Sequence, residues 1–160
     1  MSDGYTYEEL HIVEWLKTRK TSPMTGADFK YQGTKMKKNL LVKKLLSAGS
    51  DEQKVKALCT CPLTNSLFKV PVLFYGDELT YEKHALENYL RPFVGNSMLK
   101  ARSPCTGEVC DDLTFVENYT IKGLLETARD KAKKGRAASV EWNDDMWSSL
   151  RDLGSPRNNS

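Results

Sequence analysis

The sequence has few of the residues with which small proteins usually hold metal ions. It contains four cysteines and two histidines among 160 residues. Cys59 and Cys61 form a C-x-C pair, and Cys105 and Cys110 form a C-x4-C pair, with no histidine near either. Structural zinc sites usually combine wider ligand pairs in a closed tetrahedron. The spacing therefore argues against zinc, and we expect the cysteines to be buried as small apolar side chains.

Long apolar runs and a strong excess of one charge are also absent. No stretch approaches the ~20 apolar residues of a membrane span, and the polar N-terminus does not have the pattern of a secretory signal. We therefore expect a soluble protein of the cytoplasm or nucleus, where disulfides are uncommon. A net charge of +3 with both signs interspersed favours an ordinary mixed surface. Neither a membrane nor a nucleic acid is expected as a partner.

What the sequence does contain is an internal repeat. The pentapeptide SPMTG at 22–26 returns as SPCTG at 103–107, which is 81 positions later. Two further blocks align in the same order: DGYTYEELHIVEWL (3–16) with DELTYEKHALENYL (77–90), and NLLVKKLL (39–46) with NYTIKGLL (118–125). Ordered blocks with small changes of offset indicate a duplicated unit with loop insertions. We call the two units the first copy and the second copy.

The duplication predicts two small α+β domains joined by a short linker. We expect residues 1–50 to form an incomplete first domain, 51–58 a linker, and 59–130 a complete second domain. Residues 131–160 read as a polar tail. Within it, 142–150 carries an amphipathic patch that either packs back on a domain or binds a partner; its apolar residues are Trp142, Met146, Trp147 and Leu150.

In the second copy the pattern predicts a β-hairpin, a central helix, a long loop and a final helix. Alternating residues over 70–75, followed by Gly76-Asp77, predict the hairpin. Thr80 is a candidate cap for a helix over 81–90, and Asn118 for the final helix. The expected inward stripes are Ala85, Leu86, Tyr89 and Leu90 on the central helix, and Ile121, Leu124, Leu125 and Ala128 on the final one.

The first copy matches only the later part of this pattern. Thr6 and Glu9 predict a capping box, and Asn39 is a candidate cap for the second helix. His11 lies on the apolar stripe of the first helix together with Ile12, Trp15 and Leu16, and it is expected to be partly buried rather than catalytic. Because only two residues precede Asp3, the first loop and first strand have no counterpart here. Either the copy is a fragment or it is a degenerate scaffold, whose open edge is covered by the second copy, the tail or another chain.

Short polar residues recur at equivalent positions of both copies. Such side chains satisfy backbone donors in loops and at helix starts. Because the first copy has no cysteine yet shares the other blocks, we expect hydrogen bonds rather than a metal to hold the loops. The recurring pairs are Asp3/Asp77, Thr6/Thr80, Glu8/Glu82, Thr25/Thr106 and Asn39/Asn118.

These motifs together resemble the U-box domain. From Cys59 to Arg129 they occur in the order CPLT, VPV, DELTYEKHALENYL, SPCTG, Asn118 and IKGLL. The first copy resembles the later two-thirds of the same domain. The resemblance implies a zinc-free RING-like fold without cofactors, built here as two units that each have a hairpin, a central helix, two long loops and a C-terminal helix. It also implies ubiquitin ligase activity without a covalent intermediate.

The resemblance further implies where partners bind. A ubiquitin-charged conjugating enzyme is expected to dock in a shallow groove formed by the first loop, the central helix and the second loop. Leu63 is the expected apolar anchor, faced by Pro104, with Tyr89 and Leu90 supporting from the helix. The other residues expected at this surface are Thr64, Asn65, Cys105 and Gly107, and the expected loop-stabilising residues are Asp77, Thr80, Glu82, Thr106 and Asn118. Ubiquitin and a protein substrate complete the implied partners, and a homodimer stays open.

The sequence departs from the family pattern at three positions. Val70 replaces the Asp that precedes the hairpin proline, and Glu78 replaces the Gly that follows Asp77. Gly107 lies where many active members have a cation, for which Arg102 is a candidate substitute. We therefore expect weak rather than absent ligase activity. The alternative is a non-catalytic tandem scaffold or interaction module.

Overall fold

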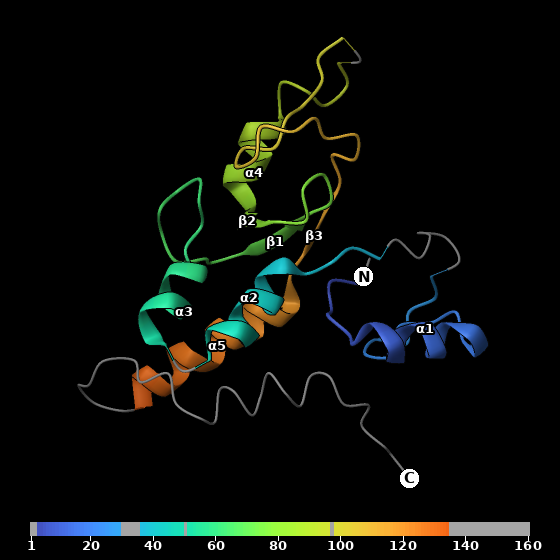
Figure 1. Ribbon diagram of the computed structural model, residues 1–160, viewed down its shortest axis with the longest axis vertical. Coiled ribbons are helices and arrows are strands. Elements are labelled where there is room, and N and C mark those ends of the chain that lie inside the picture. Colours follow the sequence, from blue (N-terminus) through green and yellow to red (C-terminus); the bar gives the residue numbers. More distant parts are fainter. Residues whose placement is uncertain (1–2, 30–35, 50, 97, 135–160) are drawn as a thin grey trace.

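The described residues form helices and a small three-stranded sheet (Figure 1). The computed structural model describes residues 3–29, 36–49, 51–96 and 98–134. The elements are α1 (Glu9–Thr18), α2 (Leu40–Ala48), α3 (Glu52–Leu58), β1 (Pro71–Phe74), β2 (Thr80–Glu82), α4 (Lys83–Leu90), β3 (Phe115–Glu117) and α5 (Tyr119–Lys134). The fold is α+β, as expected. The amphipathic patch at 142–150 lies outside the described residues. None of the described helices is long and apolar enough to cross a membrane.

The sheet is antiparallel, and its strand order is β2-β1-β3. Val72 of β1 lies opposite Tyr81 of β2 on one side and Glu117 of β3 on the other. The predicted hairpin of β1 and β2 is therefore present. All four residues of β1 are buried, because the strand is central and covered on both faces. The third strand was not predicted, since three residues carry too little periodicity to distinguish a strand from a loop.

The expectation of a hairpin in each unit is wrong for the part of the first copy that the structure describes. There, α1 and α2 are joined by a loop with an isolated bridge between Thr21 and Asp28, the counterpart of the Arg102–Val109 bridge in the second loop of the second copy. The three named strands all belong to the second copy. The physical reason is that no segment among the described residues occupies the position of β1 between residues 6–8 and 36–38.

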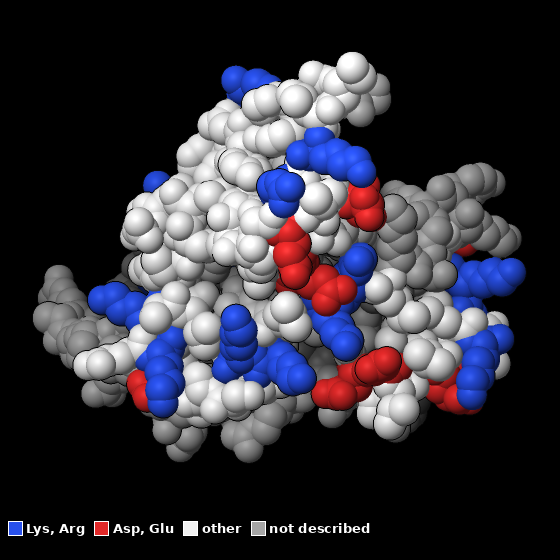
Figure 2. All heavy atoms as spheres, turned by 45° about the horizontal axis from the view of Figure 1, so that its top comes forward, with Lys and Arg blue, Asp and Glu red and all other residues white. Residues whose placement is uncertain are grey.

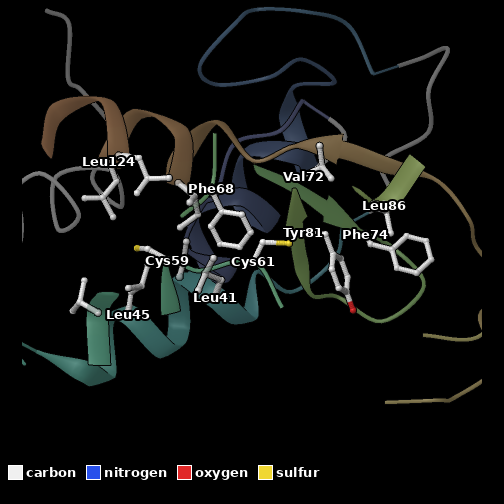
Figure 3. Close-up of a cluster of buried hydrophobic side chains, with 14 of the residues drawn as sticks. Leu41, Leu45, Cys59, Cys61, Phe68, Val72, Phe74, Tyr81, Leu86 and Leu124 are labelled. Atoms are coloured by element: carbon white, nitrogen blue, oxygen red, sulfur yellow. The ribbon is translucent and has the colours of Figure 1, made fainter. Parts of the chain in front are cut away.

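The main hydrophobic core combines residues of both copies. Leu41, Val42 and Leu45 of α2 lie in the same buried cluster as Ile121 and Leu124 of α5. Figure 3 shows this cluster between the helices and the sheet, with Leu45 and Leu124 at one end. The second helix of the first copy therefore covers the core of the second copy. Burial of such side chains is worth about 1.5–3 kcal/mol each before the entropy cost of ordering.

The segment 51–58, expected as a linker, contains α3. Asp51 caps this helix by accepting a hydrogen bond from the Lys54 N–H at 3.1 Å. Val55 is almost fully buried and belongs to the main cluster, as does Cys59 just after the helix. The connection between the copies is thus itself a packed element.

The first copy also has a small cluster of its own. Ile12 and Phe29 are buried there, and Tyr7, Trp15 and Leu16 pack against them. These residues include three of the four predicted for the inward stripe of α1. The fourth, His11, is exposed, so the prediction of a packing histidine was wrong.

The predicted caps of the central helices were also wrong. α1 begins at Glu9 and α4 at Lys83, and neither start has a side-chain cap. Thr6 and Thr80 lie before these helices, where each hydroxyl accepts a hydrogen bond from an asparagine side chain, at 2.8 and 3.2 Å respectively. Each threonine lies two residues before the N-cap residue, which is Glu8 or Glu82, so its hydroxyl is too far along the chain to reach the N–H groups that a cap binds.

Candidate functional site

The second loop of the second copy is closed by the side chain of Ser103. Its Oγ accepts hydrogen bonds from the N–H groups of Cys105 at 3.2 Å and Thr106 at 2.9 Å. Its backbone N–H donates to the Glu108 carbonyl, and its carbonyl accepts from the Gly107 N–H. Gly107 has φ +73°, a left-handed conformation that glycine adopts without steric cost. The turn is therefore specified by a serine at its start and a glycine at its end.

The first loop has the same turn, which the repeat analysis did not find. The Cys61 N–H donates to the Ser66 carbonyl, and the Asn65 N–H donates to the Cys61 carbonyl, both at 2.8 Å. Asn65 takes the left-handed position with φ +51°, which asparagine tolerates better than most residues. CPLTN at 61–65 was the available signal, since it matches SPCTG with Cys for Ser and Asn for Gly.

SPMTG in the first copy repeats the second-loop geometry closely. Ser22 Oγ accepts from the N–H groups of Met24 at 3.2 Å and Thr25 at 3.0 Å. Gly26 has φ +71° and donates its N–H to the Ser22 carbonyl. The residues that the structure describes thus include three turns of one kind, two in the second copy and one in the first.

Asp77 ties the hairpin turn of the second copy to its second loop. Its Oδ1 accepts from the Leu79 N–H at 2.9 Å. Its Oδ2 accepts from the Tyr81 and Ser103 hydroxyls, both at 2.6 Å. Burial, together with this short hydrogen bond to a carboxylate, raises the pKa of Tyr81 well above its usual range. The tyrosine therefore remains a donor throughout the physiological pH range.

Asp3 makes the corresponding contacts in the first copy, with one difference. It accepts from the Tyr5 N–H at 3.1 Å and from the Tyr7 hydroxyl at 2.7 Å. Ser22 Oγ lies 3.3 Å from the Tyr7 oxygen. The serine therefore joins the network through the tyrosine here, whereas Ser103 donates directly to the aspartate.

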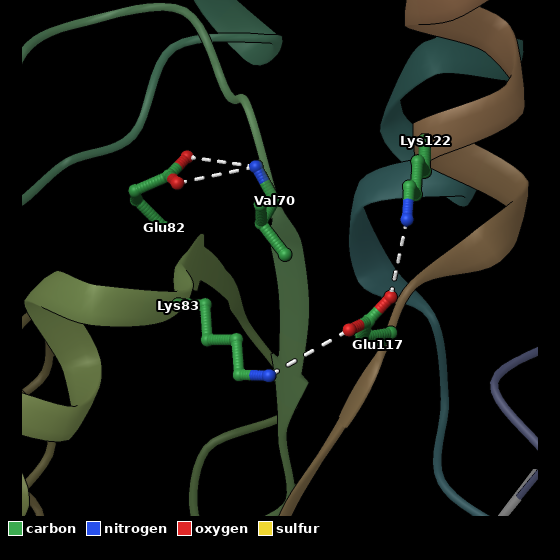
Figure 4. A network of polar contacts seen from close by, with 5 residues as sticks. All are labelled: Val70, Glu82, Lys83, Glu117 and Lys122. Carbon is green, nitrogen blue, oxygen red and sulfur yellow. Dashed lines mark hydrogen bonds and ion pairs between the residues drawn. The ribbon is translucent and has the colours of Figure 1, made fainter.

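Glu82 holds the chain between the first loop and β1. Its carboxylate accepts from the Lys69 N–H at 2.7 Å and from the Val70 N–H at 3.1 Å, and Figure 4 shows the second of these contacts. Nearby, Glu117 bridges Lys83 of α4 and Lys122 of α5, at 3.6 and 3.3 Å. These ion pairs are partly exposed and are worth little individually. The buried Glu82 carboxylate matters more, because the two backbone donors would otherwise lack a partner.

The central helix is attached to the second loop through Tyr89. Its hydroxyl donates to the Arg102 carbonyl at 3.0 Å. The Arg102 guanidinium in turn donates to the Gly107 carbonyl at 2.8 Å, so a cation lies directly beside the glycine. In the first copy the Trp15 indole N–H donates to the Thr21 carbonyl at 2.8 Å, which is the equivalent contact made by a different side chain.

The residues predicted to bind the conjugating enzyme differ in exposure. Leu63, Thr64, Tyr89 and Pro104 are half-buried, whereas Asn65, Cys105 and Gly107 are exposed. Leu90 is 2% exposed and lies in the core beneath the helix, so it can support a surface but not contact a partner. The end of the molecule that carries α4 comes forward in Figure 2, and the upper part of that view is largely uncharged. Exposed apolar residues that the sequence reasoning did not assign to this copy's surface are Leu67, Val94, Met98, Leu99 and Val109.

The two copies meet through the asparagines that cap their final helices. Asn39 caps α2, and Asn118 Oδ1 accepts from the Ile121 N–H at the start of α5, as predicted. Asn39 Nδ2 also donates to Asn118 Oδ1 at 3.1 Å. The Tyr119 N–H donates to the Gly4 carbonyl at 3.0 Å. The junction therefore includes partly buried hydrogen bonds between the copies in addition to the shared hydrophobic core.

Three of the four cysteines are buried, in line with the prediction for them. Burial raises the pKa of the Cys59 thiol to about 11, and it is also the main cause of the raised pKa of Cys110. Cys61 Sγ accepts a hydrogen bond from the Glu82 N–H at 3.2 Å. Cys105 is exposed, because the third position of the turn points outward, so the prediction was wrong for this residue. Across residues 3–29, 36–49, 51–96 and 98–134, no group of three or more His, Cys, Asp or Glu side chains could hold a metal ion.

No protein-family model matches the sequence, and a search of curated proteins finds no match to it.

Proposed function

We propose that the chain is a U-box-type ubiquitin-protein ligase that recruits a ubiquitin-charged conjugating enzyme through its second copy. We also propose that the α+β fold of the chain is of the RING-like kind. The protein would position the charged enzyme so that a lysine amine of a substrate attacks the ubiquitin thioester. No bond to this chain forms during the transfer. The proposed partners are a conjugating enzyme, ubiquitin and a substrate protein in the cytoplasm or nucleus.

The observation that carries the proposal is the pair of matching turns on either side of α4. Leu63 occupies the third position of the first-loop turn, and Pro104 the second position of the second-loop turn. The second loop is held to α4 by Tyr89 and to the hairpin by Asp77. Half-buried apolar groups on loops fixed in this way lose little entropy when a partner binds. This arrangement supports a preformed docking groove that is stabilised by hydrogen bonds.

Arg102 supports the catalytic form of the proposal. Its guanidinium donates to the Gly107 carbonyl, which places a positive charge at the position where the chain lacks the usual cation. An exposed arginine can donate two further hydrogen bonds from the same planar group. We assign Arg102 the role of contacting ubiquitin while the second loop contacts the enzyme.

The test is a ubiquitination assay on the full chain with a panel of conjugating enzymes, combined with binding measured by NMR. Leu63→Ala and Pro104→Ala are expected to lower both binding and ubiquitin discharge at least about tenfold, as hot-spot truncations do. Pro23→Ala, in the equivalent turn of the first copy, is the matched control and should change neither. Arg102→Ala should retain binding but slow ubiquitin discharge.

The second candidate function is a non-catalytic scaffold. It is favoured by Gly107 and by the absence of a counterpart of β1 among the described residues of the first copy. Binding of a conjugating enzyme without any ubiquitin discharge, unaffected by Arg102→Ala, would select the scaffold. If no member of the panel binds, or if Leu63→Ala leaves binding unchanged, the ligase proposal fails.

A further inference from the structure

A groove of about 640 Å³ lies where the first copy meets the second. On one side it is lined by the chain leading into α1, including Tyr7, Glu8 and Ile12. On the other side it is lined by Lys37 and Lys38 and by one face of α2. Its volume is within the range of small-molecule pockets. The two sides of the groove come from segments that are equivalent to β2 and β3 of the second copy.

In the second copy the corresponding space is filled by residues 68–74. β1 lies there between β2 and β3, and Phe68 packs in the main cluster together with Leu86 and Leu125. The first copy has Ile12 and Leu46 at the positions of Leu86 and Leu125. The groove is therefore the place of a central strand that the described part of the first copy does not supply.

The backbone around the groove is arranged to pair with such a strand. In the second copy the Leu79 carbonyl accepts from the Phe74 N–H, the Lys83 N–H donates to the Val70 carbonyl, and the Asn118 N–H donates to the Pro71 carbonyl. The equivalent groups in the first copy are the Tyr5 carbonyl and the N–H groups of Glu9 and Asn39. Within the part of the chain that the structure describes, none of these three groups has a hydrogen-bond partner.

The side chains of the groove show the same difference. Glu82 is 7% exposed because it accepts the Lys69 and Val70 N–H groups, whereas Glu8 is exposed. Leu125 is 5% exposed, and its equivalent Leu46 is 48% exposed. The carboxylate and the apolar side chain at these two equivalent positions are thus buried in the second copy and open to solvent in the first.

We propose that this groove binds an extended peptide strand from a partner protein, which pairs with residues 5–9 and 36–39 by β-augmentation. The chemistry of the strand follows from the segment that fills the second copy, FKVPVLF at 68–74. Apolar side chains enter at the positions of Phe68 and Val72, and two consecutive N–H groups reach the Glu8 carboxylate. Main-chain hydrogen bonds supply affinity in this mode of binding, and the pockets for alternate side chains supply specificity. The inference does not depend on ligase activity.

The probe is a fluorescent peptide with the sequence of residues 66–75, SLFKVPVLFY, titrated into the full chain. We expect saturable binding at one site, which is lost when the peptide carries Asp at the positions of Phe68 and Val72. Leu46→Asp in the protein should weaken binding at least about tenfold. Leu10→Asp is the matched control, because Leu10 is 84% exposed and lies outside the groove. Glu8→Ala is a second test variant at an exposed position and should also weaken binding.

Hydrogen exchange measured by NMR locates the bound peptide. The Glu9 and Asn39 amides should exchange rapidly in the free chain and become protected when the peptide binds. Protection that appears instead at β2 and β3 would mean that the peptide displaces β1, and this would overturn the proposal. Amides of Glu9 and Asn39 that are already protected in the monomeric chain would show that its own tail fills the groove. Protection that rises with protein concentration would show that a second copy of the chain does so. Either result, or the absence of saturable binding, rejects a partner strand.

Discussion

Replacing Asp77 with asparagine tests whether hydrogen bonds hold the loops of the second copy. Asparagine keeps the shape of the side chain, and its Oδ1 can still accept the Leu79 N–H. Its Nδ2, however, is a donor and cannot accept the Tyr81 and Ser103 hydroxyls that Asp77 accepts at 2.6 Å. Tyr81 is 0% exposed and Ser103 is 3% exposed, so water cannot replace the lost acceptor.

The size of the effect follows from these two contacts. Hydrogen bonds to a charged group contribute about 1.5–3 kcal/mol each, so Asp77→Asn, which loses two, should lower the free energy of unfolding by about 3–6 kcal/mol. Asp3→Asn removes only one such contact, and the Tyr7 hydroxyl retains Ser22 as a neighbour. We therefore expect about 1–2 kcal/mol from Asp3→Asn.

The measurement is urea denaturation of both variants, followed by circular dichroism. A double-mutant cycle of Asp77→Asn with Tyr81→Phe should give a coupling energy of about 1 kcal/mol or more, because the two side chains are in direct contact. Equal losses for Asp77→Asn and Asp3→Asn, or a loss below about 0.5 kcal/mol for Asp77→Asn, would refute the reasoning.

Three further predictions concern stability and use the same denaturation assay. Burial raises the pKa of the Cys59 thiol from 9.0 to about 11, so the folded state keeps a proton that the unfolded state releases. The free energy of unfolding should therefore fall by up to about 3 kcal/mol between about pH 9 and 11. Cys59→Val should remove that part of the pH dependence. Gly4→Ala should destabilise by about 2 kcal/mol or more, because an added Cβ would lie 2.3 Å from the Glu117 carbonyl oxygen and Gly4 has φ +79°. Glu82→Gln should cost about 1.5–3 kcal/mol, whereas Glu8→Gln, at the equivalent exposed position, should cost less than about 0.5 kcal/mol.

Each of these predictions has an outcome that contradicts it. If the free energy of unfolding is constant from about pH 8 to 11, the buried Cys59 thiol does not lower the stability at alkaline pH, and this prediction is wrong. A Gly4→Ala variant as stable as the original chain would contradict the close approach of the two copies at this residue. Equal effects of the two glutamate variants would show that the Glu82 carboxylate does not hold the chain before β1.

Much of the local structure could be predicted from short-range patterns. The stripe of Ile121, Leu124, Leu125 and Ala128 predicted the buried face of α5, and all four residues are buried. Asn39 and Asn118 predicted helix starts, because a cap acts over only three residues. The Gly76-Asp77 turn predicted the hairpin for the same reason. Such short-range interactions depend only on residues that are close in sequence, so they can be inferred without the rest of the chain.

Other features could not be predicted because they depend on distant partners. β3 exists through its pairing with β1, more than 40 positions earlier in the chain. Glu78 has φ +61° although it is not glycine, since the contacts of Asp77 hold the turn in that geometry. Thr6 and Thr80 resemble helix caps in sequence, but each binds an asparagine instead. In each case a tertiary contact overrode a local preference.

The sequence by itself thus determined the duplication, the helices with their inward faces, and the polar residues that recur in both copies. The tertiary structure alone decided how the copies combine. α2 of the first copy lies in the core of the second, and Asn39 bonds to Asn118 across the junction. It also decided that one copy encloses a central strand while the other leaves a groove. The physical reason is that periodicity reports which face of an element is apolar, whereas the identity of the element that covers the face is settled only by folding.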